Sequence, residues 1–580
     1  MGKKKDKKEK IIDSVFILVS LFLGLRLISS FFPEIRLWGL NQASYIDDMF
    51  FIYPLLFVIA VAVYIGATKY HWLTDSGQKM NFSIPHKTIY PYSIIILAGL
   101  SFYFFSANSH FLGDGYAAIS GLMNPETITK AREYGEIIFH ILFLKTFGTY
   151  TGQFARFTFQ IISYSSGLLF LIALFFYSRK LTNSRFSYYS FVILNILAAG
   201  TILYFGYVEY YSIVSMTLYV TVLSGLTAVR NQNKSIVPIF AFILSVFLHS
   251  ISLLYLPGIV IYIALTFGSE RFRLFLLHHI KTILIAMCAT YVLFYTIIKL
   301  WGPLFWQLAF LSPFGDQFTT DNYFIFSPQH LLDFANLLVF LTPITIIIGI
   351  LYFWLPKNKP ANIGRADDIF LLMVTLCGLL AAFTLEPKLS MGRDWDLMST
   401  MLIGVGITGI YFWCNKFNQL PGFRPATFLL IILSLSIFLP WAALHNSIRA
   451  MYKYNLTLME LDPKHGKAGF YTMIEFHKRQ GNNSEVNRLQ KYCESNFPEV
   501  YIVGDAETLI EQNQLDQAEI LLHKAIGHNP GWFVPYRTLA KCRIKQGDRK
   551  QALENLKLAD GLNPYNPDIT RLIDSLQSEN

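Results

Sequence analysis

Long apolar stretches separated by short polar segments are the main pattern of the first three quarters of the sequence. A helix needs about 20 mostly apolar residues to cross a bilayer. Thirteen stretches are close to that length: 11–31, 50–68, 89–107, 155–178, 186–207, 210–229, 236–249, 251–266, 281–300, 332–355, 367–385, 399–415 and 424–444. The short pair that flanks His249 is either two spans or one re-entrant hairpin. The pattern predicts an all-α, polytopic transmembrane bundle over residues 1–444.

A different pattern begins near residue 445. The segment QLDQAEILLHKAIGHNP at 514–530 aligns with DRKQALENLKLADGLNP at 548–564, at an offset of 34 residues. The recurring pairs are Ala518 and Ala552, Leu522 and Leu556, Ala525 and Ala559, and Pro530 and Pro564. This period, with small residues where two helices cross, predicts a soluble domain of tetratricopeptide-like repeats. A degenerate earlier copy is expected over about 465–498.

Composition supports this division of the chain. Charged residues make up only 15% of the 580 residues, against about 25% in a typical soluble domain. Residues 445–580 hold 17 of the 48 basic and 17 of the 38 acidic residues, so the net charge of +10 belongs to residues 1–444. This composition excludes an ordinary soluble enzyme and a disordered chain, and the charge distribution argues against nucleic-acid binding. A disulfide between Cys493 and Cys542 is not demanded by their spacing.

The basic residues predict the orientation. The start, MGKKKDKKEK, is expected in the cytoplasm, and alternation then puts most other Lys and Arg residues inside. The predicted outside loop 301–331 contains no Lys or Arg. An odd number of spans places the tail outside. No small-residue cleavage site follows the first span, so we expect an integral protein of a bacterial inner membrane, although an endoplasmic-reticulum protein would look similar.

Three regions follow from these patterns. Residues 1–88 form a lysine-rich cytoplasmic segment and two spans. Residues 89–444 form the transmembrane core, with outside loops 108–154, 301–331 and 386–398. Residues 445–580 form the extracytoplasmic repeat domain.

Charges at the outer membrane edge are candidates for function because they are costly there. In loop 108–154, Asp114 stands between two glycines and is followed by Tyr116. Asp114 is either a general base that a substrate can approach closely or an ordinary turn residue. Arg132 begins a group of charges within about 128–147, which predicts an interfacial amphipathic helix.

Two other polar residues stand in apolar surroundings. Glu209, in FGYVEYYS, is either a second carboxylate of the site or an incidental residue in an aromatic belt. His249 is either a ligand-binding residue or an interhelical hydrogen-bond partner. His330, with Asp316 and Asp321 in loop 301–331, is a weaker candidate.

The segment EPKLSMGRDWDLMS at 386–399 places five charged residues in eleven positions, at 386–396. Lys388 and Arg393 suit a phosphate or pyrophosphate group. Asp394 and Asp396 can orient these cations or hold a hydroxyl, and Trp395 offers a surface on which a sugar can stack. The alternative is a salt-bridged loop that contacts the tail. The sequence contains no HExxH, CxxC or Walker A motif.

The combined architecture resembles the GT-C superfamily of integral-membrane glycosyltransferases, and most of all its transmembrane-and-repeat protein O-mannosyltransferases. Asp114 in FLGDGY lies in a large outside loop, many spans follow, and a repeat domain lies on the same side. In that family the aspartate follows the first span and often has an acidic neighbour. Here it follows the third span and has glycine on both sides, so Glu209 is the candidate second carboxylate.

The resemblance implies transfer of a sugar from a polyprenyl-phosphate donor to an acceptor hydroxyl, with inversion. It implies that Asp114 acts on the hydroxyl while Lys388, Arg393 and Arg132 hold the departing phosphate. Asp394, Trp395, Asp396, His249 and Tyr116 remain candidate sugar or substrate contacts. Some members use a divalent cation such as Mg²⁺ or Mn²⁺ and others do not, which the sequence leaves open, as it leaves a protein or a glycan acceptor open.

Two other functions stay in competition. A polysaccharide polymerase or ligase would transfer whole glycans and depend more on basic loop residues. A transporter, or a membrane scaffold that recruits a protein partner through its repeats, would need no catalytic residues. Transporters place polar residues near the middle of several spans. These spans have few apart from Arg26 and His249, which favours chemistry at the outer rim.

Overall fold

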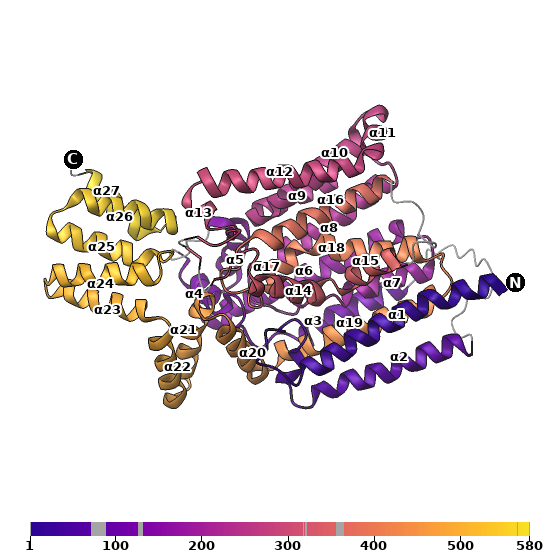
Figure 1. The fold of residues 1–580 in the computed structure, drawn as a ribbon, viewed down its shortest axis with the longest axis horizontal. Coiled ribbons are helices and arrows are strands. Elements are labelled where there is room, and N and C mark those ends of the chain that lie inside the picture. Colours follow the sequence, from indigo (N-terminus) through magenta and orange to yellow (C-terminus); the bar gives the residue numbers. More distant parts are fainter. Residues whose placement is uncertain are drawn as a thin grey trace.

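The structure is a computed structural model that describes residues 2–70, 89–125, 131–316, 318–319, 322–354, 365–564 and 566–578. In these ranges every regular element is helical, and an isolated β-bridge pairs Phe310 with Leu385. Figure 1 shows a bundle of long helices with the helices of the tail gathered at one end. The all-helical class is therefore confirmed. Asp321 and residues 71–88 and 355–364, which hold most of two predicted inside segments, lie outside the described residues.

Eight helices of the described chain are long and apolar enough to cross a membrane, or up to ten if each of two bent pairs is one span. The eight are α1 (Gly2–Ser29), α2 (Ile52–Thr68), α6 (Gly152–Leu181), α8 (Ser212–Arg230), α10 (Leu256–Phe267) with η6 (Ser250–Tyr255), α12 (Ile280–Trp301), α16 (Ala366–Thr384) and α19 (Phe423–Asn446). The bent pairs are α14 (Pro328–Leu341) with α15 (Pro343–Trp354), at 97°, and α17 (Trp395–Met401) with α18 (Ile403–Phe412) and η8 (Trp413–Phe417), at 52°.

The remaining predicted spans are shorter than expected. They correspond to α3 (Ile89–Phe104), α7 (Arg185–Ile196) with η5 (Ala199–Tyr204), and α9 (Val237–Leu248). His249 ends α9 because its backbone is extended, with φ −150° and ψ 122°, and η6 begins directly after it. A hydropathy pattern does not predict a helix break of this kind inside an apolar stretch. The structure thus shows eight to ten candidate spans where the sequence predicts thirteen.

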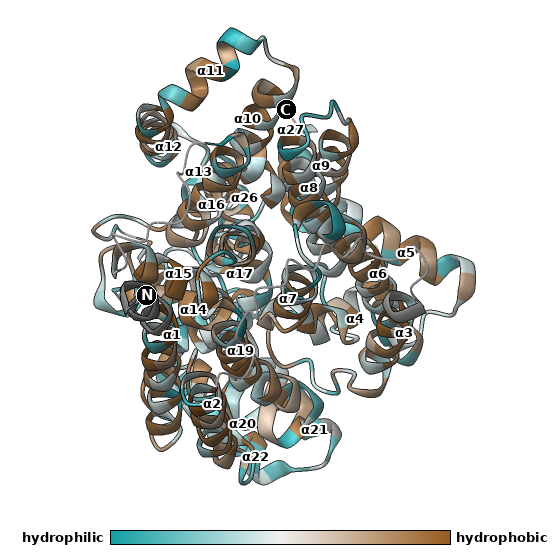
Figure 2. Ribbon diagram, turned by 90° about the vertical axis from the view of Figure 1, so that its right-hand side faces the viewer, coloured by the Kyte–Doolittle hydropathy of each residue, from teal (hydrophilic) through white to brown (hydrophobic). Residues whose placement is uncertain are grey.

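Helices α8 and α12 mark the centre and the edge of the bundle. In the most apolar 18 residues of α8, 83% are buried, whereas in those of α12 only 6% are buried. Figure 2 looks along the bundle, with largely hydrophobic helices seen end-on and α12 at the periphery. Hydrocarbon-facing side chains explain this apolar but exposed helix. The C-terminal end of α12 leads into α13 (Leu304–Gln307), which reaches the candidate site.

The tail is a series of short helices that begins immediately after α19. They are α20 (Ile448–Leu461), α21 (Pro463–Arg479), α22 (Asn483–Asn496), α23 (Pro498–Glu511), α24 (Leu515–His528), α25 (Phe533–Gln546), α26 (Arg549–Leu562) and α27 (Pro567–Ser578). The recurring residues Ala518, Leu522, Ala525, Ala552, Leu556 and Ala559 are all fully buried. The period of 34 residues therefore corresponds to repeated helix packing. All five cysteines are free, so Cys493 and Cys542 form no disulfide.

Candidate functional site

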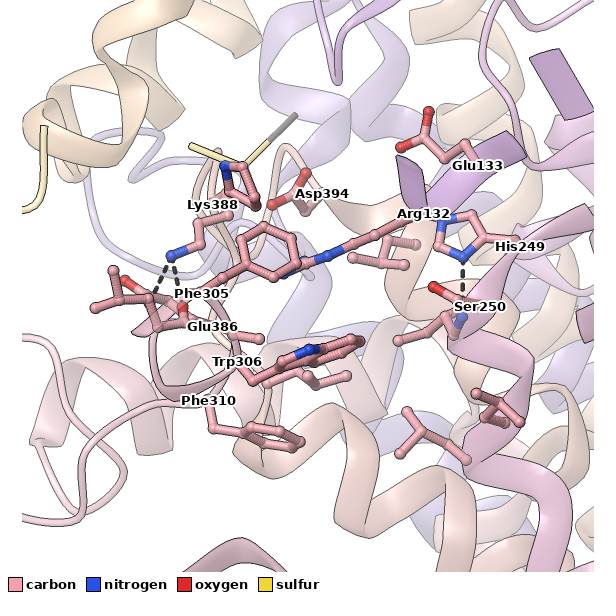
Figure 3. Close-up of a pocket in the computed structure, with 18 of the residues that line it drawn as sticks. Arg132, Glu133, His249, Ser250, Phe305, Trp306, Phe310, Glu386, Lys388 and Asp394 are labelled. Atoms are coloured by element: carbon pink, nitrogen blue, oxygen red, sulfur yellow. Dashed lines mark hydrogen bonds and ion pairs between the residues drawn. The ribbon is translucent and has the colours of Figure 1, made fainter. Parts of the chain in front are cut away.

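A cavity of about 690 Å³ lies where the bundle meets the tail. Five residues that the sequence singled out line it together: Asp114, Arg132, His249, Lys388 and Asp394. They come from three loops that are distant in sequence. Figure 3 shows most of these residues around the cavity, with the Arg132 side chain extending across it.

The walls of the cavity differ in chemistry. Its apolar wall comes from η6 and α12 and includes Leu253, Leu254, Phe294 and Ile298. Another part of its lining comes from the tail and includes Gly531, Leu562, Asn563 and Pro564. A ligand in this cavity would thus contact membrane helices and the tail at the same time.

Asp114 is held at the cavity by the turn that precedes α4 (Gly115–Met123). It is the N-cap residue of α4, but its side chain makes no capping hydrogen bond to the helix. Gly113 has φ +61°, in the left-handed region that glycine adopts without strain. A Cβ atom at Gly113 would also lie 2.6 Å from Glu209 Oε1 and 3.0 Å from Asp396 Oδ2. Gly113 is thus required both by its φ and by this close approach.

Glu209 contacts the backbone of Asp114. Its side chain is buried, and its Oε1 accepts a hydrogen bond from the backbone N–H of Asp114. Glu209 is not among the residues that line the cavity. The structure brings the two predicted carboxylates together, and it gives Glu209 a contact to the Asp114 backbone.

Arg393 lies beneath the same loop and outside the cavity lining. Its guanidinium is 2% exposed; Nη2 donates to the carbonyl oxygens of Phe111 and Gly113, each at 3.4 Å, and Nε donates to Asn455 Oδ1 at 3.0 Å. Since Asn455 belongs to α20, Arg393 connects the Asp114 loop to the start of the tail. This placement differs from the phosphate contact expected from the sequence.

The neighbours of Arg393 divide between cavity and core. Asp394 lines the cavity, and its Oδ2 accepts a hydrogen bond from Leu389 N at 2.8 Å. Burial raises the pKa of Asp394 to about 6 despite this hydrogen bond, and the Asp114 carboxylate adds to the increase. Asp396 is buried and accepts a hydrogen bond from the Tyr207 hydroxyl at 3.2 Å. Trp395 is fully buried against Tyr207 and Trp441, with ring centroids 5.2 and 5.0 Å away, so it is placed as a core residue.

Arg132 is paired with an aromatic cluster that the sequence did not single out. Its guanidinium carbon lies 4.1 Å from the Phe305 ring centroid and 5.7 Å from that of Trp306. Burial lowers the pKa of Arg132, and the adjacent Glu133 carboxylate opposes that shift. The aromatic rings keep this cation in place without neutralising its charge. The sequence LFWQ in the predicted outside loop 301–331 was the available signal for this pair.

Lys388 lies on the wall opposite His249. Its Nζ donates to Leu308 O at 2.6 Å and to Glu386 Oε2 at 2.9 Å. His249 accepts a hydrogen bond from Ile251 N at 3.0 Å through Nδ1, and its ring stacks on Tyr211 with ring centroids 5.4 Å apart.

Tyr116 packs against His110 and Phe111 and does not line the cavity. Glu133, Tyr211 and Glu386 also line it. Glu386 belongs to the charged segment 386–399 that the sequence singled out, whereas Tyr211 was given no role.

The question of a bound metal depends on side chains of the right kind converging at one point. Among the residues that the structure describes, no group of three or more His, Cys, Asp or Glu side chains is arranged to hold a metal ion. We derive no step through the divalent cation considered above.

Comparison of the chain with protein-family models, with curated proteins and with solved structures finds no match.

Proposed function

We propose that the protein is a membrane glycosyltransferase of the GT-C type. It transfers a sugar from a polyprenyl-phosphate donor to an acceptor hydroxyl on the extracytoplasmic face, with inversion. The observation that carries this proposal is the shared cavity. A carboxylate (Asp114) and two cations (Arg132 and Lys388) line one space that has an apolar wall of membrane helices.

Each part of the donor has a chemically matching part of the cavity. The apolar wall suits the first isoprene units of the lipid. Arg132 and Lys388 suit the phosphate, because charge-assisted hydrogen bonds are the strong ones. Phe305 and Trp306 provide aromatic faces beside these cations.

The reaction is a single displacement. As the acceptor oxygen attacks the anomeric carbon, the Asp114 carboxylate takes the hydroxyl proton. The bond between the anomeric carbon and the phosphate oxygen breaks, and the polyprenyl phosphate leaves with its electron pair. One displacement inverts the anomeric configuration, as in inverting glycosidases. Glu209 and Arg393 contribute by fixing the backbone of the Asp114 loop.

The proposal is tested by reconstituting the full chain with radiolabelled polyprenyl-phosphate sugars and varying Arg132. Arg132→Gln removes a charge-assisted hydrogen bond worth roughly 1.5–3 kcal/mol. We therefore expect its apparent donor KM to rise by about 10- to 100-fold, while kcat changes little. Label transferred to a protein or glycan acceptor is the measurement.

Lys145→Gln is the matched control, because Lys145 is an exposed cation on the neighbouring α5 (Tyr134–Phe147). Absence of transfer by the wild-type chain contradicts the proposed function. An unchanged donor KM in Arg132→Gln contradicts the role of Arg132 alone. Transfer of whole glycans in place of single sugars favours the polymerase or ligase.

We also propose the finer topology of thirteen crossings. The start of α1 and the tail lie at opposite ends of the bundle in Figure 1, and opposite ends require an odd number of crossings. If both bent pairs cross the membrane the count is ten, which is even, so the three shorter helices α3, α7 and α9 are proposed to bring it to thirteen. The helix pairs of the tail are proposed to be tetratricopeptide-like repeats outside a bacterial inner membrane.

A cysteine at position 520 tests this topology. Ile520 is 68% exposed on α24, so an impermeant thiol reagent is expected to label Ile520→Cys in intact cells from the outside. The five native cysteines are mostly buried, and the parent chain serves as the control. Labelling only after the cells are broken open would place the tail inside and contradict the thirteen-crossing topology.

A further inference from the structure

Six charged side chains form a continuous series that runs from α14 through the start of the tail to the cavity. In order they are Asp333, Arg36, Asp462, His465, Glu386 and Lys388, and their charges alternate. The consecutive nitrogen-to-oxygen distances are 3.0, 3.6, 2.8, 3.5 and 2.9 Å. We refer to these six residues as the charge chain.

The charge chain joins four separate parts of the protein. Asp333 lies on α14, and Arg36 lies in the loop after α1. Asp462 and His465 lie at the start of α21, the second helix of the tail. Glu386 and Lys388 line the cavity. The tail thus touches the cavity wall through His465.

His465 is the link between the tail and the wall. Its Nδ1 lies 2.8 Å from Asp462 Oδ1, and its Nε2 lies 3.5 Å from Glu386 Oε1. Burial alone would lower its pKa, but Asp462 and Glu386 raise it to about 10. The ring is therefore an imidazolium cation at neutral pH, placed between two carboxylates.

Glu386 in turn shares its charge between two cations. Burial alone would raise its pKa, but Lys388 and His465 lower it to about 2. One carboxylate oxygen faces His465, and the other faces Lys388. Lys388 is the end of the charge chain, with its side chain 53% exposed, and no second carboxylate holds it in an ion pair within the described residues.

We infer that His465 is a positioning residue for Lys388, because it takes up part of the charge of Glu386 and so leaves the Lys388 ammonium available for a phosphate in the cavity. If His465 loses its charge, the whole charge of Glu386 acts on Lys388. Removing one charge of a buried ion pair leaves the other charge without compensation. Without the His465 cation, the Glu386 carboxylate would therefore bind the Lys388 ammonium more strongly. That the phosphate belongs to a lipid-linked sugar rests on the proposed function.

The experiment measures binding of a fluorescent short-chain polyprenyl phosphate to the full chain in lipid nanodiscs, with no sugar and no acceptor present. His465→Gln is expected to weaken binding by about tenfold, within the coupling range of contacting residues. Adding Glu386→Gln to it removes the charge that holds Lys388, and binding is expected to return to within about twofold of wild type. His523→Gln is the control, because His523 is exposed and forms an ion pair with Glu519 in its own helix.

A merely structural role for His465 would not be reversed by a second substitution. The double variant therefore separates the two explanations, and Glu386→Gln alone gives a second test that does not depend on how well His465→Gln folds. By itself, Glu386→Gln is expected to tighten binding. Weaker binding in Glu386→Gln, no recovery in the double variant, or unchanged binding in His465→Gln would each overturn the inference, as would no saturable binding by the wild-type chain.

Two further comparisons separate the inference from the proposed function. Inorganic phosphate is added as a competitor. Displacement at equal concentration would identify a free-phosphate site, which supports the role of His465 and contradicts the lipid as the source of the anion. If the binding pattern holds while the wild-type chain transfers no sugar, the inference stands and the glycosyltransferase proposal fails.

Discussion

Asp114→Asn is expected to lower sugar transfer by about 10²- to 10⁴-fold, the range typical of removing a general base. The substitution preserves the shape of the side chain and the backbone N–H that Glu209 accepts. The fold of the loop should therefore persist. Asp114 belongs to the cavity lining, where an acceptor hydroxyl would lose its proton. The measurement is the rate of transfer from the lipid-linked donor by the reconstituted chain.

Donor binding provides the internal control for this variant. Since the neutral Asn removes a negative charge near the phosphate, donor affinity is expected to stay the same or to increase. Asp47→Asn is the matched control, because Asp47 is exposed and lies in the loop between α1 and α2. Wild-type transfer by Asp114→Asn would rule out Asp114 as the base.

Arg393→Met should produce the second largest loss. Arg393 makes three hydrogen bonds, to Phe111 O, Gly113 O and Asn455 Oδ1. Hydrogen bonds to charged groups are worth roughly 1.5–3 kcal/mol each, so thermal stability is expected to fall. A displacement of the loop by about 1 Å is enough to cost about 100-fold in rate. We therefore expect a lower kcat with little change in donor KM.

Asn455→Ala is the graded comparison for Arg393→Met. It removes the partner of Nε and leaves both carbonyl contacts, so its loss of kcat should be intermediate. Thermal unfolding and steady-state kinetics of both variants are the measurements. A rise in donor KM without a loss of kcat would show that Arg393 contacts the phosphate directly, as the sequence analysis first suggested.

The class of the fold was predictable because it depends on composition and periodicity. Runs of apolar residues predict membrane helices, and the period of 34 residues predicts paired helices, whose recurring residues are buried. The number of spans was less predictable. A break such as the one at His249 depends on its extended backbone, which hydropathy does not encode.

The site was predictable only in part. Charges beside the apolar stretches were the signal for Asp114, Arg132 and Lys388, because charged residues are costly at a membrane edge. The structure brings these three residues to one cavity. Sequence did not distinguish residues that face the cavity from those that support it. Arg393 and Asp394 are adjacent in the chain, yet Asp394 lines the cavity and Arg393 contacts the backbone behind it. Asn563 and Pro564 line the cavity because the tail packs against the bundle, and no local sequence pattern predicts that packing.

The loop that carries Asp114 is held through its main chain as well as through buried side chains such as Phe111 and Leu112. Glu209 accepts from the N–H of Asp114, and Arg393 donates to the carbonyl oxygens of Phe111 and Gly113. Main-chain groups are the same for nearly every amino acid, so these contacts place little demand on neighbouring side chains. Substitutions that keep these buried side chains packed would leave the main-chain contacts unchanged, with Gly113 and Asp114 as the fixed points. Distant relatives would then share the geometry of this turn and its two anchors long after residues outside the loop had ceased to resemble one another.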